Sequence, residues 1–142
     1  MNISEREIID LLVNEFWRRG YFTLSRRMGT YLPEPTAIGK FNVDVVGRQK
    51  DRYAVGIILS QNDLNDVKFI EKITFLASRH SRFSKKPITL LIGVPVIYYK
   101  HVKHIINNLE EELKRNIKLI KISENKEAVL SDNREQSEVL FS

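Results

Sequence analysis

The chain has 142 residues, of which 42% are hydrophobic, so it is the size of one domain with a buried core. It contains no cysteine, which excludes disulfides, thiolate metal sites and cysteine nucleophiles. Its net charge is +5, and an acidic stretch over residues 124–142 leaves a more basic body that suits a polyanion such as DNA.

The first predicted element is a helix over residues 5–19. Ser4 and Glu7 have the spacing of a capping box, apolar residues recur at helical spacing after them, and Gly20 ends the pattern. The opening MNISEREIID lacks the basic and apolar pattern of a signal peptide, and no apolar run approaches the length of a membrane span. We therefore predict a cytoplasmic protein without a membrane partner.

Three strands are predicted next. Residues 21–25 form a short strand, and the loop over residues 26–40 is rich in proline and glycine. Residues 41–46 and 53–59 are rich in β-branched and aromatic side chains and predict a hairpin. The turn between them, GRQKD, is too short for a crossover, so these strands are expected to be antiparallel.

The hairpin is predicted to have one apolar face and one face of small or polar residues. With the turn centred near Lys50, Asp44 is expected opposite Gly56 on the second face. The apolar face would hold Phe41, Val43, Val45, Tyr53, Val55, Ile57 and Leu59. The second face would hold Asn42, Asp44, Val46, Ala54, Gly56, Ile58 and Ser60. This face of small and polar residues predicts a cleft around Asp44. The alternatives are that the face is exposed to solvent or that a helix packs on its small residues.

The second half of the chain alternates helices and strands. Helices are expected over residues 62–81, with Val67, Ile70, Ile73 and Leu76 facing inward, and over residues 98–115. Residues 87–96 predict a strand covered on both faces, and residues 117–123 predict an edge strand. The order of elements gives an α/β domain over residues 1–123 with a central mixed sheet flanked by helices, followed by a tail over residues 124–142.

This order, with an aspartate in the second strand (FNVDVVG), resembles the PD-(D/E)xK nuclease superfamily, which includes restriction endonucleases and archaeal Holliday junction resolvases. The resemblance covers roughly residues 4–122 and implies a restriction-endonuclease-like αβββαβ core. In that family the second strand supplies an aspartate, and the third supplies an acid, a spacer and a lysine. Asp44 matches the aspartate, whereas Gly56 and Ile58 stand at the other two positions, so the motif is degenerate.

The resemblance implies a Mg²⁺ or Mn²⁺ site at Asp44, since such ions take oxygen ligands and activate water. Glu15 is the expected second metal ligand and catalytic acid, because family members often place a glutamate on the first helix. Glu71 and Lys72 are candidates for a relocated acid and lysine, although a solvated helix face is the alternative. Gln61 matches a polar position that some relatives use near the metal.

Basic residues near two loops and at the end of the first helix form the predicted nucleic-acid surface. They are Arg18, Arg19, Arg26, Arg27, Arg79, Arg82, Lys85 and Lys86. The resemblance would place the first four beside Asp44, and Phe83 or Tyr31 could stack on a base. Core packing of Phe83, and charge that only aids solubility, are the alternatives.

Three functions follow from the sequence. The first is a DNA-binding protein of nuclease-like fold with an incomplete metal site, acting as a non-catalytic or accessory subunit, alone, as a homodimer or with a partner. The second is an active Mg²⁺- or Mn²⁺-dependent endonuclease that uses Asp44 with relocated groups. The third is a protein-interaction module that uses the acidic tail and an exposed sheet edge.

Overall fold

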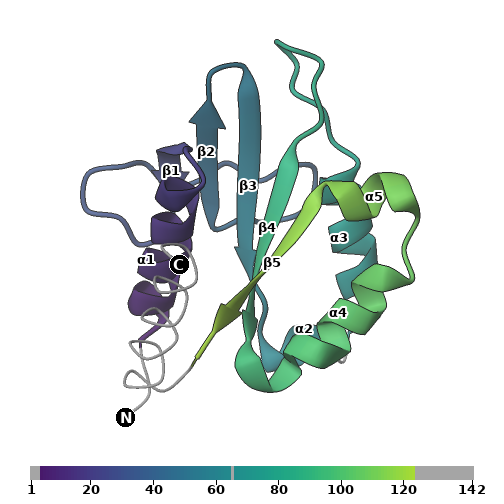
Figure 1. Ribbon diagram of the computed structural model, residues 1–142. Coiled ribbons are helices and arrows are strands. Elements are labelled where there is room, and N and C mark those ends of the chain that lie inside the picture. The colour runs from purple at the N-terminus through teal and green to yellow at the C-terminus, as the bar shows by residue number, and fades with distance from the viewer. Residues whose placement is uncertain (1–3, 65, 124–142) are drawn as a thin grey trace, which may run out of the picture.

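The computed structural model describes residues 4–64 and 66–123, so the predicted tail lies outside the described residues. One five-stranded mixed sheet has helices on both faces, which confirms the α/β class (Figure 1). The helices are α1 (Glu5–Arg18), α2 (Gln61–Leu64), α3 (Lys68–Ala77), α4 (Tyr99–Asn107) and α5 (Glu111–Arg115), with a 3₁₀ turn, η1 (Val96–Tyr98), before α4. The strands are β1 (Phe22–Arg26), β2 (Val45–Gln49), β3 (Arg52–Ile58), β4 (Thr89–Pro95) and β5 (Ile117–Ile122).

The strands lie in the sheet in the same order as in the sequence. The first three are antiparallel, and β3, β4 and β5 are parallel, with α2 and α3 in the first crossover and α4 and α5 in the second. Within the described residues β5 pairs only with β4, so the predicted edge strand is confirmed. None of the helices in this part of the chain is long and apolar enough to cross a membrane.

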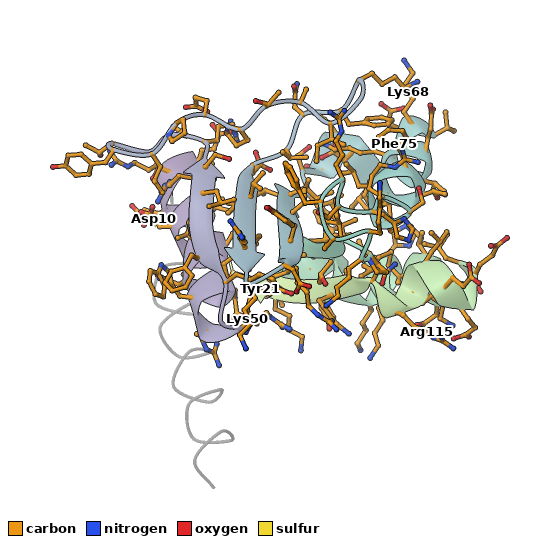
Figure 2. All side chains as sticks on the ribbon, turned by 90° about the horizontal axis from the view of Figure 1, so that it is seen from above. Asp10, Tyr21, Lys50, Lys68, Phe75 and Arg115 are labelled. Atoms are coloured by element: carbon orange, nitrogen blue, oxygen red, sulfur yellow. The ribbon has the colours of Figure 1, made fainter. Side chains whose placement is uncertain are left out.

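Helix α1 covers one face of the sheet, as the view from above in Figure 2 shows on the side where Asp10 is labelled. Ser4 Oγ accepts a hydrogen bond from Glu7 N at 3.2 Å, which confirms the expected N-terminal cap. Leu12 and Phe16 are fully buried against the sheet. A Cβ atom at Gly56 would lie 2.9 Å from atoms of both side chains, so the small residue makes room for the helix.

Helices α3 and α4 pack on the opposite face, where Phe75 is labelled in Figure 2. The single helix expected over residues 62–81 is wrong, because the chain forms two shorter helices there. Asp66 Oδ1 accepts from Lys68 N at 2.9 Å and caps the new helix. Val67, expected inward, is 88% exposed, and Phe69 is buried in its place. The helix expected over residues 98–115 is likewise divided, into α4 and α5.

The predicted register of the hairpin is wrong by one residue. Strand β2 begins at Val45, and Val45 lies opposite Gly56. The cause is a two-residue turn in which Lys50 adopts a left-handed conformation with φ of 56°. Val45 therefore packs under α1 and Val46 faces the other layer, the reverse of the expected faces. The small residues of β3 on this side pack against helix α1. Helix packing on small residues, the alternative to a cleft, is therefore what the structure shows.

Candidate functional site

Asp44 lies at a bend just before β2 and completes the hydrogen bonding at the end of β3. Its backbone N donates to Gly56 O at 2.9 Å. Its carboxylate Oδ2 accepts from Ile58 N at 2.7 Å, and Oδ1 accepts from Arg27 Nε at 2.7 Å. The side chain is only 15% exposed. Both carboxylate oxygens are thus engaged by donors from the protein itself.

Arg27 connects this carboxylate to helix α1. Its Nη2 lies 2.5 Å from Glu5 Oε1, and its backbone N donates to Asp44 O at 2.8 Å. Burial by itself lowers the pKa of Arg27, but the hydrogen bonds with Glu5 and Asp44 outweigh burial and raise this pKa above its usual value. A permanent cation therefore lies between the two carboxylates.

Glu15 lies elsewhere on α1. Its carboxylate pairs with Arg18 at 2.5 Å and with Arg19 at 3.4 Å, beside β5. Glu15 follows Glu5, the acid bridged to Asp44, by ten residues, which is about 15 Å along a helix. The structure therefore does not bring Glu15 and Asp44 together. As arranged, the two do not fit a shared magnesium site, and residues 4–64 and 66–123 hold no cluster of three His, Cys, Asp or Glu suited to a metal.

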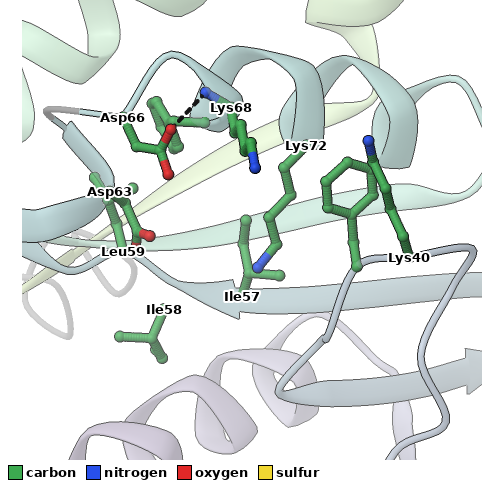
Figure 3. A pocket seen from close by; sticks show the side chains of 10 residues that line it. Lys40, Ile57, Ile58, Leu59, Asp63, Asp66, Lys68 and Lys72 are labelled. Atoms are coloured by element: carbon green, nitrogen blue, oxygen red, sulfur yellow. Dashed lines mark hydrogen bonds between the residues drawn. The ribbon is translucent and has the colours of Figure 1, made fainter.

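A pocket of about 290 Å³ lies at the end of β3, where Lys72 lines it (Figure 3). Lys40, Lys68, Asp63 and Asp66 also line this pocket. Glu71 does not line it, and its carboxylate pairs with Lys40 Nζ at 2.6 Å.

The carboxylates of this pocket have structural roles. Asp63 Oδ2 accepts from Ser60 N at 2.8 Å, and Asp66 caps α3. Gln61 is exposed at the start of α2 and does not line the pocket. Of the relocated groups expected from the sequence, Lys72 lines this pocket and Glu71 and Gln61 do not, so the predicted combination of Glu71 with Lys72 is not assembled there.

The four arginines predicted to border Asp44 are engaged by acids of α1. Arg26 Nη2 lies 2.7 Å from Asp10 Oδ1, and the pairs of the other three are described above. Only Arg27 lies beside Asp44. The pairs of Arg26 and Arg27 hold α1 to the end of β1, whereas the pairs of Arg18 and Arg19 lie at the end of α1 itself, and all four reduce the charge available to a polyanion. The sequence reasoning missed the pairs of Arg26 and Arg27, because their acids come from a separate element.

The loop between α3 and β4 is tightly ordered. Ser81 is buried, and its Oγ accepts from Phe83 N at 3.2 Å and from Ser84 N at 3.4 Å. Ser81 N donates to Lys86 O at 2.9 Å, and Lys85 turns the chain with φ of 63°. These bonds make residues 81–86 a compact turn that holds Phe83 outward, with 87% of its surface exposed.

This turn and the β2–β3 turn lie at the same end of the sheet (Figure 1), opposite the end where β3 meets the Lys72 pocket. Lys86 Nζ joins them by an ion pair with Asp51 Oδ2 at 2.8 Å. The hydrogen bond from Lys86 lowers the pKa of Asp51 below its usual value. The carboxylate is therefore ionised and paired at neutral pH.

An open groove of about 630 Å³ lies along β2 and β3 beside the loop after α3, and an adjoining hollow of about 480 Å³ between the two turns shares Tyr53 and Phe83 with it. We call the two together the Tyr53–Phe83 groove. Its aromatic and cationic lining consists of Tyr53, Phe75 and Phe83 with Arg48, Arg79 and Arg82. Cations and rings in one groove suit a ligand that combines negative charge with flat apolar surfaces.

Two of the three arginines of the groove lie against its rings. The Arg79 guanidinium lies 4.3 Å from the centroid of Phe75, and that of Arg48 lies 5.8 Å from the centroid of Tyr53. Arg48 Nε also donates to Lys50 O at 2.6 Å. The sequence predicted Arg79 and Arg82 as contacts but missed Phe75, and it missed Arg48 and Tyr53 because the arrangement of the strands in the sheet brings them to the loop.

The two regions differ in access. The Asp44 carboxylate is closed by Arg27, whereas the Tyr53–Phe83 groove is open to solvent.

The chain matches no protein-family model, no curated protein and no solved structure.

Proposed function

We propose that this protein binds nucleic acid through the Tyr53–Phe83 groove and acts as a non-catalytic or accessory protein of nuclease-like fold. One observation carries the proposal: three arginines and three aromatic rings from separate elements converge on one open groove. Arginine contacts phosphates, and aromatic rings stack on bases of any sequence. The acid at the groove, Asp51, is neutralised by Lys86 and does not oppose a polyanion.

The order of elements supports the nuclease-like part of the proposal. A helix, an antiparallel set of three strands, a crossover and a parallel fourth strand follow one another, as in a restriction-endonuclease-like αβββαβ core. Strand β5 then extends the sheet. The fold assignment is an inference from this order, and function is argued from the groove.

The surroundings of Asp44 favour a non-catalytic role. A magnesium ion bound for phosphodiester cleavage needs carboxylate oxygens that are free to coordinate it. Both oxygens of Asp44 accept hydrogen bonds, and the acid position of the third strand lacks a carboxylate. An endonuclease is the second candidate, favoured by Lys72 in the pocket at the end of β3. Incubation of labelled DNA with the protein and Mg²⁺ or Mn²⁺ tests it, and we expect no cleavage.

Replacing Arg48, Arg79 and Arg82 together by glutamine is expected to weaken DNA binding about tenfold or more. Each lost phosphate contact removes about 0.7–0.9 from the slope of log affinity against log salt, so we expect this slope to fall by about 2. Fluorescence anisotropy with a labelled oligonucleotide at several salt concentrations measures both quantities.

The matched control removes the same number of positive charges from a surface outside the groove. Lys100, Lys103 and Lys118 are exposed and do not line the groove. Their triple glutamine variant should retain most of the affinity. Equal losses in the two variants would indicate general attraction to a basic protein and would contradict a site at the groove.

A further inference from the structure

We infer that the Tyr53–Phe83 groove takes unpaired nucleobases, so that single-stranded nucleic acid binds more tightly than duplex. The inference rests on the proposed function and names the class of nucleic acid. It follows from the ordered turn that holds Phe83, from the second ring that Tyr53 supplies to the groove, and from the arginines that line the groove.

Phe83 is an apolar side chain held in water by an ordered backbone. In the same turn the polar hydroxyl of Ser81 is buried and the phenyl ring is 87% exposed, which is the reverse of the usual partition. Leaving a large apolar side chain in water forgoes the stabilisation that burial gives. Ser81 Oγ accepts hydrogen bonds from the amides of Phe83 and Ser84, so the turn is already ordered before a ligand binds. Binding to the Phe83 ring therefore avoids the entropy cost of ordering a flexible loop.

Tyr53 supplies a second ring on a rigid element. It belongs to β3 and pairs with Arg48 of β2, so its position is set by the sheet. Tyr53 and Phe83 line both hollows of the groove. The volume of about 630 Å³ is in the range of ligand pockets, roughly 300–1,000 Å³. A base turned toward such a groove can lay its face on an aromatic ring.

Duplex bases do not offer their faces in this way. They are stacked on their neighbours and paired, so a protein reaches their faces only after extruding them at a cost of a few kcal/mol, whereas a single strand presents them directly. The arginines beside the rings suit the phosphates that flank an unpaired base. A groove lined by both aromatic rings and cations therefore matches a single strand better than a duplex.

The test measures binding of the full chain to a 15-nucleotide single strand, to the duplex of the same sequence and to the corresponding RNA strand. We expect both single strands to bind at least tenfold more tightly than the duplex. Phe83→Ala should weaken single-strand binding about tenfold, because stacking is lost, and should leave the salt slope unchanged, because no charge is lost. Phe83→Tyr, which keeps the ring, should restore the affinity.

Tyr31→Ala is the matched control, because Tyr31 is 96% exposed and does not line the groove. Photo-cross-linking of a strand that contains 5-iodouracil gives a second readout, and we expect the cross-link at Phe83 or Tyr53. If the arginine variant weakens binding but single strand and duplex bind equally, or if Phe83→Ala behaves as Tyr31→Ala does, the inference fails and the proposed function stands. If neither nucleic acid binds in a salt-dependent way, the proposed function fails and the inference falls with it.

Discussion

Replacing Asp44 by asparagine is expected to lower the free energy of unfolding by about 1–3 kcal/mol, because a partly buried charged pair and a hydrogen bond are broken together. The two carboxylate oxygens accept from Arg27 Nε and Ile58 N. An amide has one oxygen, so its NH₂ group must face one of these donors. Arg27 then retains only Glu5 as an acidic partner. Denaturant unfolding in buffer without divalent cations measures the change.

A relic metal site predicts the opposite result for the same variant. Repulsion between Asp44 and a neighbouring acid would be relieved, so stability without metal would be preserved or raised, and Mn²⁺ would stabilise only the parent protein. That pair of outcomes would contradict the structural role assigned here. Glu71→Gln is the control, because it breaks an exposed ion pair with Lys40 and should cost less than about 1 kcal/mol.

Gly56→Glu is expected to abolish cooperative folding. The resemblance to nucleases places an acid at this position, so the substitution would appear to restore the motif. A Cβ atom there would lie 2.9 Å from Leu12 Cδ2 and from Phe16 Cε1, and both side chains are fully buried. Overpacking and an unpaired buried carboxylate together should cost more than about 4 kcal/mol. Thermal unfolding followed by circular dichroism measures the loss.

Gly56→Ala provides the graded control. It adds only a methyl group, so it should destabilise by about 1–3 kcal/mol, and the double variant with Leu12→Ala should lose less stability than the sum of the two single losses, because the shorter side chain makes room. A folded Gly56→Glu protein that Mn²⁺ stabilises would show that α1 can move aside and that the cleft hypothesis was correct.

Local patterns were sufficient to predict most elements of this fold. The cap at Ser4 and the buried run of β4 depend on neighbours within a few residues. The break before α3 was missed, although its signal was local: Asp66 caps the helix two residues before Lys68. Helical periodicity across residues 62–81 hid this cap.

The candidate site could not be predicted in the same way. Its two regions depend on the conformation of Lys50, which sets the hairpin register, and on pairs such as Arg27 with Asp44, which are 17 residues apart. A one-residue shift in register exchanges the faces of a strand. Asp44 was therefore identified as unusual, but its partners, and the meeting of Arg48 with the 81–86 turn, required the three-dimensional arrangement.

The contact of α1 with the last strand also affects how the chain is made. Ile9, Leu12 and Phe16 are translated more than 100 residues before Ile120 and Ile122, which pack in the same cluster. At a translation rate of about 5–20 residues per second, β5 is made roughly 5–20 s after α1. During that time β5 does not cover the apolar face of α1. The sheet can grow strand by strand in translation order, but the face of α1 is covered in full only after β5 has been made.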